Sequence, residues 1–328
     1  MAVFTNDVGL KAGTVGAATR SRTTSGLGLA VLSAASFGMS GPLAGGLLDT
    51  GWSPGAIVLV RMGLAAFVVV PFGLRALGGR WALLRRNVRL VVTYGLLAVA
   101  TAQFCYFSAV SYMPVAPALL IEYTAPAAVV SWLWLRHGQR PGPVTLLGAF
   151  LAAMGLVLVL DLLTGTDVSL RGVAWALGAM VGAASYFVIS ADEDNGLPPL
   201  VLAAGGLLVG TVVLALLGLT GLLPMRAATA ATEYADRTVA WWAPLLILGL
   251  VTAALAYTTG IGAGRRLGSR LASFVALLEV LAGVVFAWVL LDQLPRPVQL
   301  LGSLLILAGV VAVKLGEQTV DRRDPTGT

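Results

Sequence analysis

The chain has 328 residues, of which 58% are hydrophobic and only 11% are charged, and its formal net charge is +6. A soluble domain carries about 25% charged residues, so this composition excludes an ordinary soluble protein and predicts that lipid covers much of the surface. Nucleic-acid binding is not indicated, because no basic patch is interleaved with aromatic residues. The single cysteine, Cys105, excludes an internal disulfide.

The two ends of the chain are more polar than the rest. Residues 1–24 are rich in small residues and contain three basic ones, which predicts a disordered cytoplasmic tail. A cleaved signal peptide is the alternative, but the apolar run that follows is about 22 residues long and exceeds the hydrophobic region of a typical signal peptide. Residues 317–328 are predicted to form a cytoplasmic C-terminal tail.

Apolar runs between the two tails are long enough to cross a membrane. A spanning helix needs about 20 mostly apolar residues, and ten runs approach that length, the third and fourth being separated by the corner Tyr112-Met113-Pro114. The predicted spans are residues 26–48, 54–76, 89–111, 114–136, 143–161, 171–191, 197–220, 241–263, 268–291 and 296–315. The predicted fold class is therefore an all-α integral membrane protein with ten transmembrane helices.

The basic residues predict how these spans are oriented. With the N-terminus inside the cell, the internal segments hold 16 Lys and Arg residues and the external segments hold 4, while Arg61 lies within a span. Lys and Arg concentrate in the cytoplasmic loops of membrane proteins. We therefore expect a multi-pass protein of the cell membrane with both termini in the cytoplasm.

An internal repeat relates the two parts of the chain. A shift of 154 residues aligns residues 94–160 with residues 248–314 without a gap. Within this alignment, Gln139–Gly148 falls on Gln293–Gly302 with identical glutamine, proline and glycine residues. Chance matches of Leu and Ala are common in apolar sequences, but matches of these residue types at one shift indicate a duplicated unit.

The repeat predicts two halves of five helices each, residues 25–162 and 163–316. Because five is an odd number of spans, the two halves have opposite orientations in the membrane. Such inverted repeats are a recurring transporter architecture, with the substrate site near the bilayer midplane where the repeats meet. The sequence therefore predicts a transporter.

Three ionisable residues lie well inside predicted spans: Arg61, Glu122 and Glu279. A charge at the bilayer centre costs at least about 2.5–3.5 kcal/mol, so each should face the interior of the bundle. At 1.5 Å per residue, Arg61 and Glu122 fall at similar depths. This predicts an Arg61–Glu122 pair, with Gln103 and Tyr106 near the cavity wall. The alternative is that the pair is purely structural and the arginine only neutralises the glutamate.

Glu279 falls nearest the midplane and has no obvious partner, although Tyr257 is one candidate. A buried carboxylate without a partner favours its protonated form, because burial disfavours the charge. Glu279 then either carries a proton in a coupled transport cycle or donates a hydrogen bond to a neighbouring helix. Both alternatives stay open here.

Several segments resemble the EamA-type family of the drug/metabolite transporter superfamily. In the second half these are residues 246–257, 265–279 and 299–310, which are similar to the last three helices of an EamA domain. In the first half, Leu120–Pro126 is similar to the fourth helix of the threonine/homoserine exporters in that superfamily.

The chain departs from the family pattern at two kinds of position. Gln139 and Gln293 stand where family members usually carry glutamate, which argues against protonation sites in those loops. Val280 stands where the family usually has proline, which puts a break of the ninth helix at that point in doubt.

The resemblance also implies a ring of aromatic residues around a central cavity, on helices one, three, six and eight: Phe37, Tyr106, Tyr186 and Tyr257. Packing against other helices is the alternative for each of them. Four pairs of glycines at a spacing of four residues are predicted to be helix-packing sites. They are Gly41/Gly45, Gly178/Gly182, Gly206/Gly210 and Gly260/Gly264.

The predicted function is a secondary transporter that exports a small amino acid or similar metabolite by alternating access. A non-transporting membrane sensor or scaffold, and an uptake permease or facilitator, are the alternatives. No nucleotide-binding motif or catalytic cluster occurs, and one histidine, His137, cannot make a metal site, so we expect neither an enzyme nor a cofactor. The expected partners are a small-molecule substrate and the lipid bilayer. Proton coupling, a homodimer, the substrate's identity and the direction of transport stay open.

Overall fold

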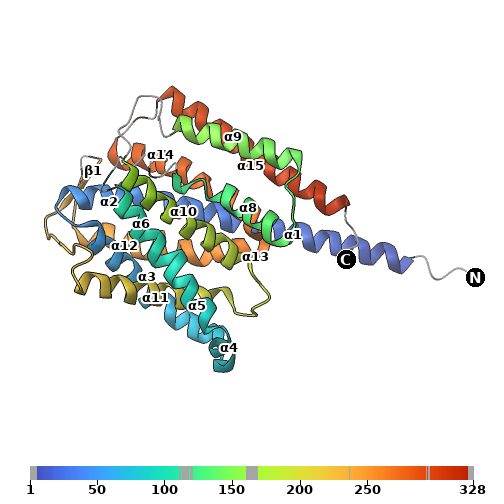
Figure 1. Cartoon of the computed structure of the whole chain (residues 1–328), viewed down its shortest axis with the longest axis horizontal. Helices are drawn as coiled ribbons and strands as arrows, with labels where there is room; N and C mark the ends of the chain where they lie inside the picture. The colour runs from blue at the N-terminus through green and yellow to red at the C-terminus, as the bar shows by residue number, and fades with distance from the viewer. Residues whose placement is uncertain are drawn as a thin grey trace, which may run out of the picture.

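The computed structural model describes residues 6–110, 112, 118, 121–159, 169–235, 237–292, 294 and 296–323. It is a bundle of helices with one short β-hairpin (Figure 1). The first half contains α1 (Asn6–Gly38), α2 (Ser40–Asp49), α3 (Pro54–Leu77), α4 (Trp81–Arg86), α5 (Val88–Tyr94), the π-helix η1 (Gly95–Thr101), α6 (Ala102–Val110), α8 (Ala125–His137) and α9 (Pro143–Val159).

The second half begins with α10 (Leu170–Ala191) and α11 (Pro199–Leu219), which are followed by the antiparallel strands β1 (Thr232–Tyr234) and β2 (Arg237–Val239). It continues with α12 (Trp242–Gly249), the π-helix η3 (Leu250–Leu255), α13 (Ala256–Ala276), α14 (Leu278–Leu291) and α15 (Pro297–Arg323).

Six helical segments of the described chain are long and apolar enough to cross a membrane, and three further apolar helices are shorter. The long segments are Ser21–Asp49, Pro54–Leu77, Val88–Tyr106, Leu170–Ala191, Pro199–Leu219 and Trp242–Ala276, and the shorter ones are Pro143–Leu158, Leu278–Leu290 and Leu300–Gly316. The protein is thus a multi-pass helical membrane protein, while the count of ten spans stays a prediction. Residues 114–117, 119 and 120 at the start of the predicted fourth span, and Met113 of the predicted corner, lie outside the described residues.

Helix extends into both segments that the sequence predicts as tails, since α1 begins at Asn6 and α15 ends at Arg323. α12, η3 and α13 run on to Ala276, so the segment between the predicted eighth and ninth spans is helical. The chain bends inside α13 at Gly268, where φ is +75°, a left-handed conformation that a residue without a Cβ adopts readily. The bend therefore falls at the first residue of the predicted ninth span, 268–291.

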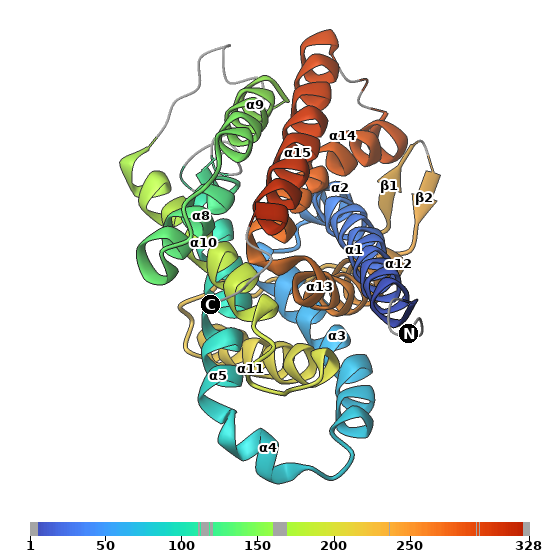
Figure 2. The same ribbon diagram turned by 90° about the vertical axis from the view of Figure 1, so that its right-hand side faces the viewer.

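α9 and α15 pack side by side, as Figures 1 and 2 both show, through glycines that are equivalent under the 154-residue shift. A Cβ on Gly148 would lie 2.7 Å from the carbonyl oxygen of Gly309, and a Cβ on Gly155 would lie 2.5 Å from that of Gly302. Gly148 corresponds to Gly302 and Gly155 to Gly309, so the contacts are reciprocal and the helices are antiparallel. This is the pattern that a two-fold axis between the repeats produces.

The two π-helices also occupy equivalent positions in the repeat. Residues 95–101 of η1 correspond to residues 249–255, and η3 covers Leu250–Leu255. π-helical turns are rare and often lie at functional sites. Gln103 follows the end of η1 by two residues, and Tyr257 follows the end of η3 by two residues. These two residues are equivalent under the 154-residue shift, and both face the interior of the bundle.

Polar contacts join several helices at the end of the bundle where α10 meets α11. Arg22 of α1 forms an ion pair with Glu193. Arg265 of α13 donates from Nη1 to the Leu197 carbonyl at 2.6 Å, and Asn87 donates from Nδ2 to the carbonyl of Asn195 at 3.0 Å. The loop between α10 and α11 is thereby tied to α1, to α13 and to the start of α5.

Candidate functional site: a central cavity

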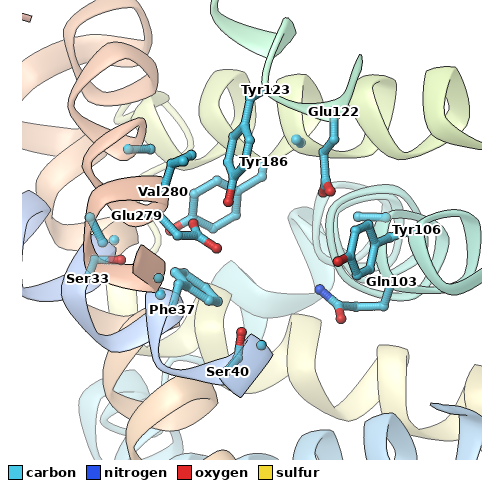
Figure 3. Close-up of a pocket in the computed structure, with 18 of the residues that line it drawn as sticks. Ser33, Phe37, Ser40, Gln103, Tyr106, Glu122, Tyr123, Tyr186, Glu279 and Val280 are labelled. Carbon is cyan, nitrogen blue, oxygen red and sulfur yellow. The ribbon is translucent and has the colours of Figure 1, made fainter. Parts of the chain in front are cut away.

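A cavity of about 690 Å³ lies between helices of both halves. Its size falls within the range of about 300–1,000 Å³ that is usual for small-molecule sites. All eight residues that the sequence predicts as site residues line this cavity, and several of them point into it in Figure 3. They are Phe37, Arg61, Gln103, Tyr106, Glu122, Tyr186, Tyr257 and Glu279.

Arg61 of α3 is the cationic residue of the cavity, and only 5% of it is exposed. Its Nη2 donates a hydrogen bond of 2.7 Å to the carbonyl oxygen of Thr252 in η3. Its Cζ lies 5.8 Å from the ring centroid of Phe37, which is within reach of a cation–π interaction. Its Nε has no hydrogen-bond partner among the described residues.

The predicted Arg61–Glu122 ion pair is absent. Within the described part of the chain the one ion pair is Arg22–Glu193. The ionisable groups that influence Arg61 electrostatically are Tyr257 and Glu279, and Glu122 is not among them. The prediction was wrong because the rise per residue predicts only the depth of a side chain, not its direction around the bundle.

Glu122 and Glu279 approach the cavity from two different halves, and the charge of Glu279 acts on Glu122 (Figure 3). Tyr123 is a hydrogen-bond partner of Glu279, which the sequence analysis missed when it considered only Tyr257. Tyr123 directly follows Glu122, and its phenol can donate to the carboxylate. The two glutamates are therefore linked through neighbouring residues of one segment.

Aromatic rings form a connected cluster along one side of the cavity. Tyr257 makes edge-to-face contacts with Phe37, at 5.2 Å between centroids, and with Tyr186, at 5.8 Å. Tyr94 lies 6.1 Å from Tyr186 and extends the cluster, but it is fully buried and does not line the cavity. A Cβ on Gly260 would lie 1.9 Å from the Tyr186 hydroxyl oxygen, so the absence of a side chain there admits the phenol.

The predicted packing role of the glycine pairs is correct for three of the four. Added Cβ atoms would contact other helices at Gly178, Gly182, Gly206, Gly210, Gly260 and Gly264. The prediction was wrong for Gly41 and Gly45, where a Cβ would have no neighbour within 4 Å. Both residues line the cavity instead. The side chain of His137 lies outside the described residues.

Two stretches of the chain, residues 24–161 and 170–315, each match the EamA-like transporter family. The chain belongs to the EamA-like transporter family. The double match agrees with the internal repeat, and it confirms the resemblance on which the sequence analysis relied.

Curated relatives of this EamA protein include two that are named as exporters. The threonine/homoserine exporter RhtA of Salmonella typhimurium (strain SL1344) is 26% identical over 283 residues, which cover 83% of this chain and 84% of the relative. RhtA of Escherichia coli (strain K12) is 26% identical over 282 residues with the same coverage. One solved crystal structure has the same fold, with a TM-score of 0.70 and 22% identity over 90% of this chain and 98% of that one.

Proposed function

We propose that this EamA protein exports a small amino acid, or a metabolite with the same charged groups, from the cytoplasm. One observation carries the proposal: a buried guanidinium and two carboxylates face a single cavity between the two halves. An amino acid carries the complementary groups, a carboxylate suited to Arg61 and an ammonium suited to Glu122 and Glu279. The names of the two relatives support the same substrate class.

The transport cycle that we propose is alternating access by rocking of one half against the other. The reciprocal contacts of α9 with α15 support an inverted relation between the halves. The polar contacts around Glu193 join α1, α13 and the loop between α10 and α11 at one end of the bundle, which supports a closed state at that end. The distribution of Lys and Arg assigns that end to the cytoplasm, so this conformation would be closed on the cytoplasmic side.

Charge balance in the cavity supports coupling to protons. One guanidinium, Arg61, neutralises only one of two carboxylates, and an uncompensated charge at this depth is costly. The second negative charge is then balanced either by a bound proton or by the ammonium of the substrate. If a proton from outside replaces the substrate ammonium at Glu122 and Glu279, the export of substrate is coupled to the uptake of protons.

Flux in liposomes tests the transport step. Purified protein should accelerate the exchange of radiolabelled threonine or another member of an amino-acid panel, and an imposed pH gradient should drive accumulation. Glu122→Gln combined with Glu279→Gln should abolish that accumulation. Flux that ignores the pH gradient in both proteins would exclude proton coupling, and no flux for any panel member would favour the sensor or scaffold alternative.

The direction of transport needs a cellular measurement. We expect cells that express the protein to release more of at least one amino acid than matched cells that lack it, when exported metabolites are compared without preselection. Accumulation inside the expressing cells would instead indicate an uptake permease.

A further inference from the structure

Gly41 and Gly45 stand on the face of α2 that lines the cavity. A Cβ on either residue would meet no heavy atom within 4 Å. The other α2 residues that line the cavity are mostly small as well: Ser40, Pro42, Ala44 and Leu48. This face of α2 therefore leaves open space inside the cavity instead of filling it with side chains.

The opposite face of α2 is held by the β-hairpin. The hydroxyl of Tyr234 donates a 2.6 Å hydrogen bond to the Leu43 carbonyl, and a Cβ on Gly46 would lie 2.6 Å from the Tyr234 ring. Burial raises the pKa of Tyr234 to about 12, so this hydroxyl keeps its proton near neutral pH. Because the hairpin contacts this opposite face, α2 cannot readily move away from the cavity. A side chain added at Gly41 or Gly45 must therefore occupy cavity space.

The cavity wall changes from polar to apolar toward α2. Along α3, the lining residues Ile57 and Val58 come before Arg61, and along α14, Val284 and Ala287 come after Glu279. The cavity thus has one level with charged groups and, next to α2, an apolar compartment. In Figure 3, Ser40 marks the α2 side of the view, away from Glu122 and Tyr123.

One buried polar atom in the cavity points to a ligand. Arg61 is 5% exposed, and its Nε has no hydrogen-bond partner in the described part of the chain. A buried donor without a partner is costly, and a bound ligand with an acceptor group would satisfy it.

We infer that Gly41 and Gly45 determine which substrates fit, and that the substrate class includes zwitterionic amino acids with an apolar side chain larger than that of threonine. This inference rests on the proposed function. The charged head group lies at the level of Arg61 and the two glutamates, and the apolar side chain extends into the compartment beside α2. Gly41 and Gly45 are specificity-determining residues in this arrangement.

Flux of leucine and of threonine should be compared in liposomes that contain the wild type, Gly41→Val, Gly45→Val or the control Gly28→Val. Gly28 is also a helical glycine with open space around it, but it does not line the cavity. We expect Gly45→Val to lower the leucine-to-threonine ratio of kcat/KM by about tenfold or more, because one methylene in an apolar pocket changes kcat/KM by about 10–200-fold. Gly28→Val should leave the ratio unchanged.

An unchanged ratio in both cavity variants, or an equal loss of both substrates, would overturn the inference while leaving the proposed function intact. Threonine flux without leucine flux in the wild type would also overturn the inference. If the wild type moves no member of the amino-acid panel, the proposed function fails, and the compartment is tested without transport. Gly45→Cys in a Cys105→Ala background should then react in purified protein with a bulky aromatic maleimide as well as with a small thiol reagent. Leu47→Cys, on the buried back face, should react with neither. A cysteine at position 45 that excludes the bulky reagent would contradict the inference.

Discussion

Arg61 is stabilised at membrane depth by weak partners rather than by an ion pair. The Thr252 carbonyl accepts one hydrogen bond, the Phe37 ring lies 5.8 Å away, and the charge of Glu279 acts on it from farther off. Each of these offsets only part of the cost of burying a guanidinium. The residue therefore keeps the capacity to bind an anionic group, which a tight pair with Glu122 would have taken away.

Arg61→Gln tests this capacity. We expect it to raise the KM for an amino-acid substrate by roughly 10- to 100-fold, because hydrogen bonds to charged groups contribute about 1.5–3 kcal/mol. Arg61→Lys keeps the charge but not the planar fork and should recover part of the loss. The KM of both variants is measured from the dependence of flux on substrate concentration in liposomes. Arg85→Gln, at an exposed position outside the cavity, is the control. Equal KM values for wild type and Arg61→Gln would contradict a role in binding.

Tyr123 connects the two carboxylates, since it follows Glu122 and is a hydrogen-bond partner of Glu279. A double-mutant cycle with Tyr123→Phe and Glu279→Met should show a coupling of about 0.5–1.5 kcal/mol in the free energy of unfolding. The same cycle with Tyr94→Phe in place of Tyr123→Phe should show none, because no interaction joins Tyr94 to Glu279 in the described part of the chain. Strictly additive effects for Tyr123 and Glu279 would mean that the hydrogen bond does not contribute.

At the scale of elements, glycines decide which helices approach closely. α9 and α15 meet through reciprocal glycine contacts, and α10 meets α13 where Gly260 admits Tyr186. Small residues permit such close approach, which matters in lipid because no hydrophobic force acts between helices. The two π-helices, η1 and η3, bring Gln103 and Tyr257 to equivalent places in the cavity wall.

Gly155→Val tests the α9–α15 contact. A Cβ there would lie 2.5 Å from the Gly302 carbonyl oxygen and 2.7 Å from the Ile306 amide nitrogen, so the two helices would have to separate. We expect a loss of about 1–3 kcal/mol of stability, as is usual for overpacking, seen as a lower melting temperature of the purified protein in detergent. Gly28→Val, which adds the same atoms in open space, should melt like the wild type. Identical melting of the two variants would exclude tight packing at Gly155.

For the whole molecule, the two ends of the bundle differ in their contacts and in their charge. The end near α4 carries Arg80, Arg85 and Arg86 and includes the Arg22–Glu193 ion pair, whose side chains are 55% and 45% exposed. Ion pairs this exposed contribute only about 0–1 kcal/mol, so they can open during a transport cycle. The β-hairpin between α11 and α12 lies at the other end, where Tyr234 contacts α2.

Cysteine labelling in intact cells tests the proposed orientation. In a Cys105→Ala background, Glu233→Cys in the exposed hairpin should react with a membrane-impermeant thiol reagent. Arg85→Cys in α4 should react only after the membrane is permeabilised, because Lys and Arg concentrate on the cytoplasmic side. The opposite pattern would reverse the proposed orientation and, with it, the side to which this conformation is closed.

Much of the architecture could be predicted along the chain, because hydropathy and repeated glycine and proline positions are properties of the linear sequence. The predicted spans 54–76, 171–191 and 197–220 match α3, α10 and α11 to within a few residues. The bend at Gly268 coincides with the predicted start of the ninth span, although the sequence does not reveal the φ angle of this glycine. The π-helices were missed, since no residue pattern in η1 or η3 distinguishes them from α-helix.

The sequence by itself determined the membrane class, the duplicated unit and the polar residues that face the interior at membrane depth, because a polar side chain in an apolar run must turn inward to escape lipid. Only the tertiary structure decided which of those residues meet. Arg61 bonds to Thr252 and not to Glu122, Glu279 pairs with Tyr123, and Gly41 with Gly45 faces open space. The physical reason is that the helical rise sets the depth of a residue, whereas its partners depend on how helices of both halves rotate as they pack.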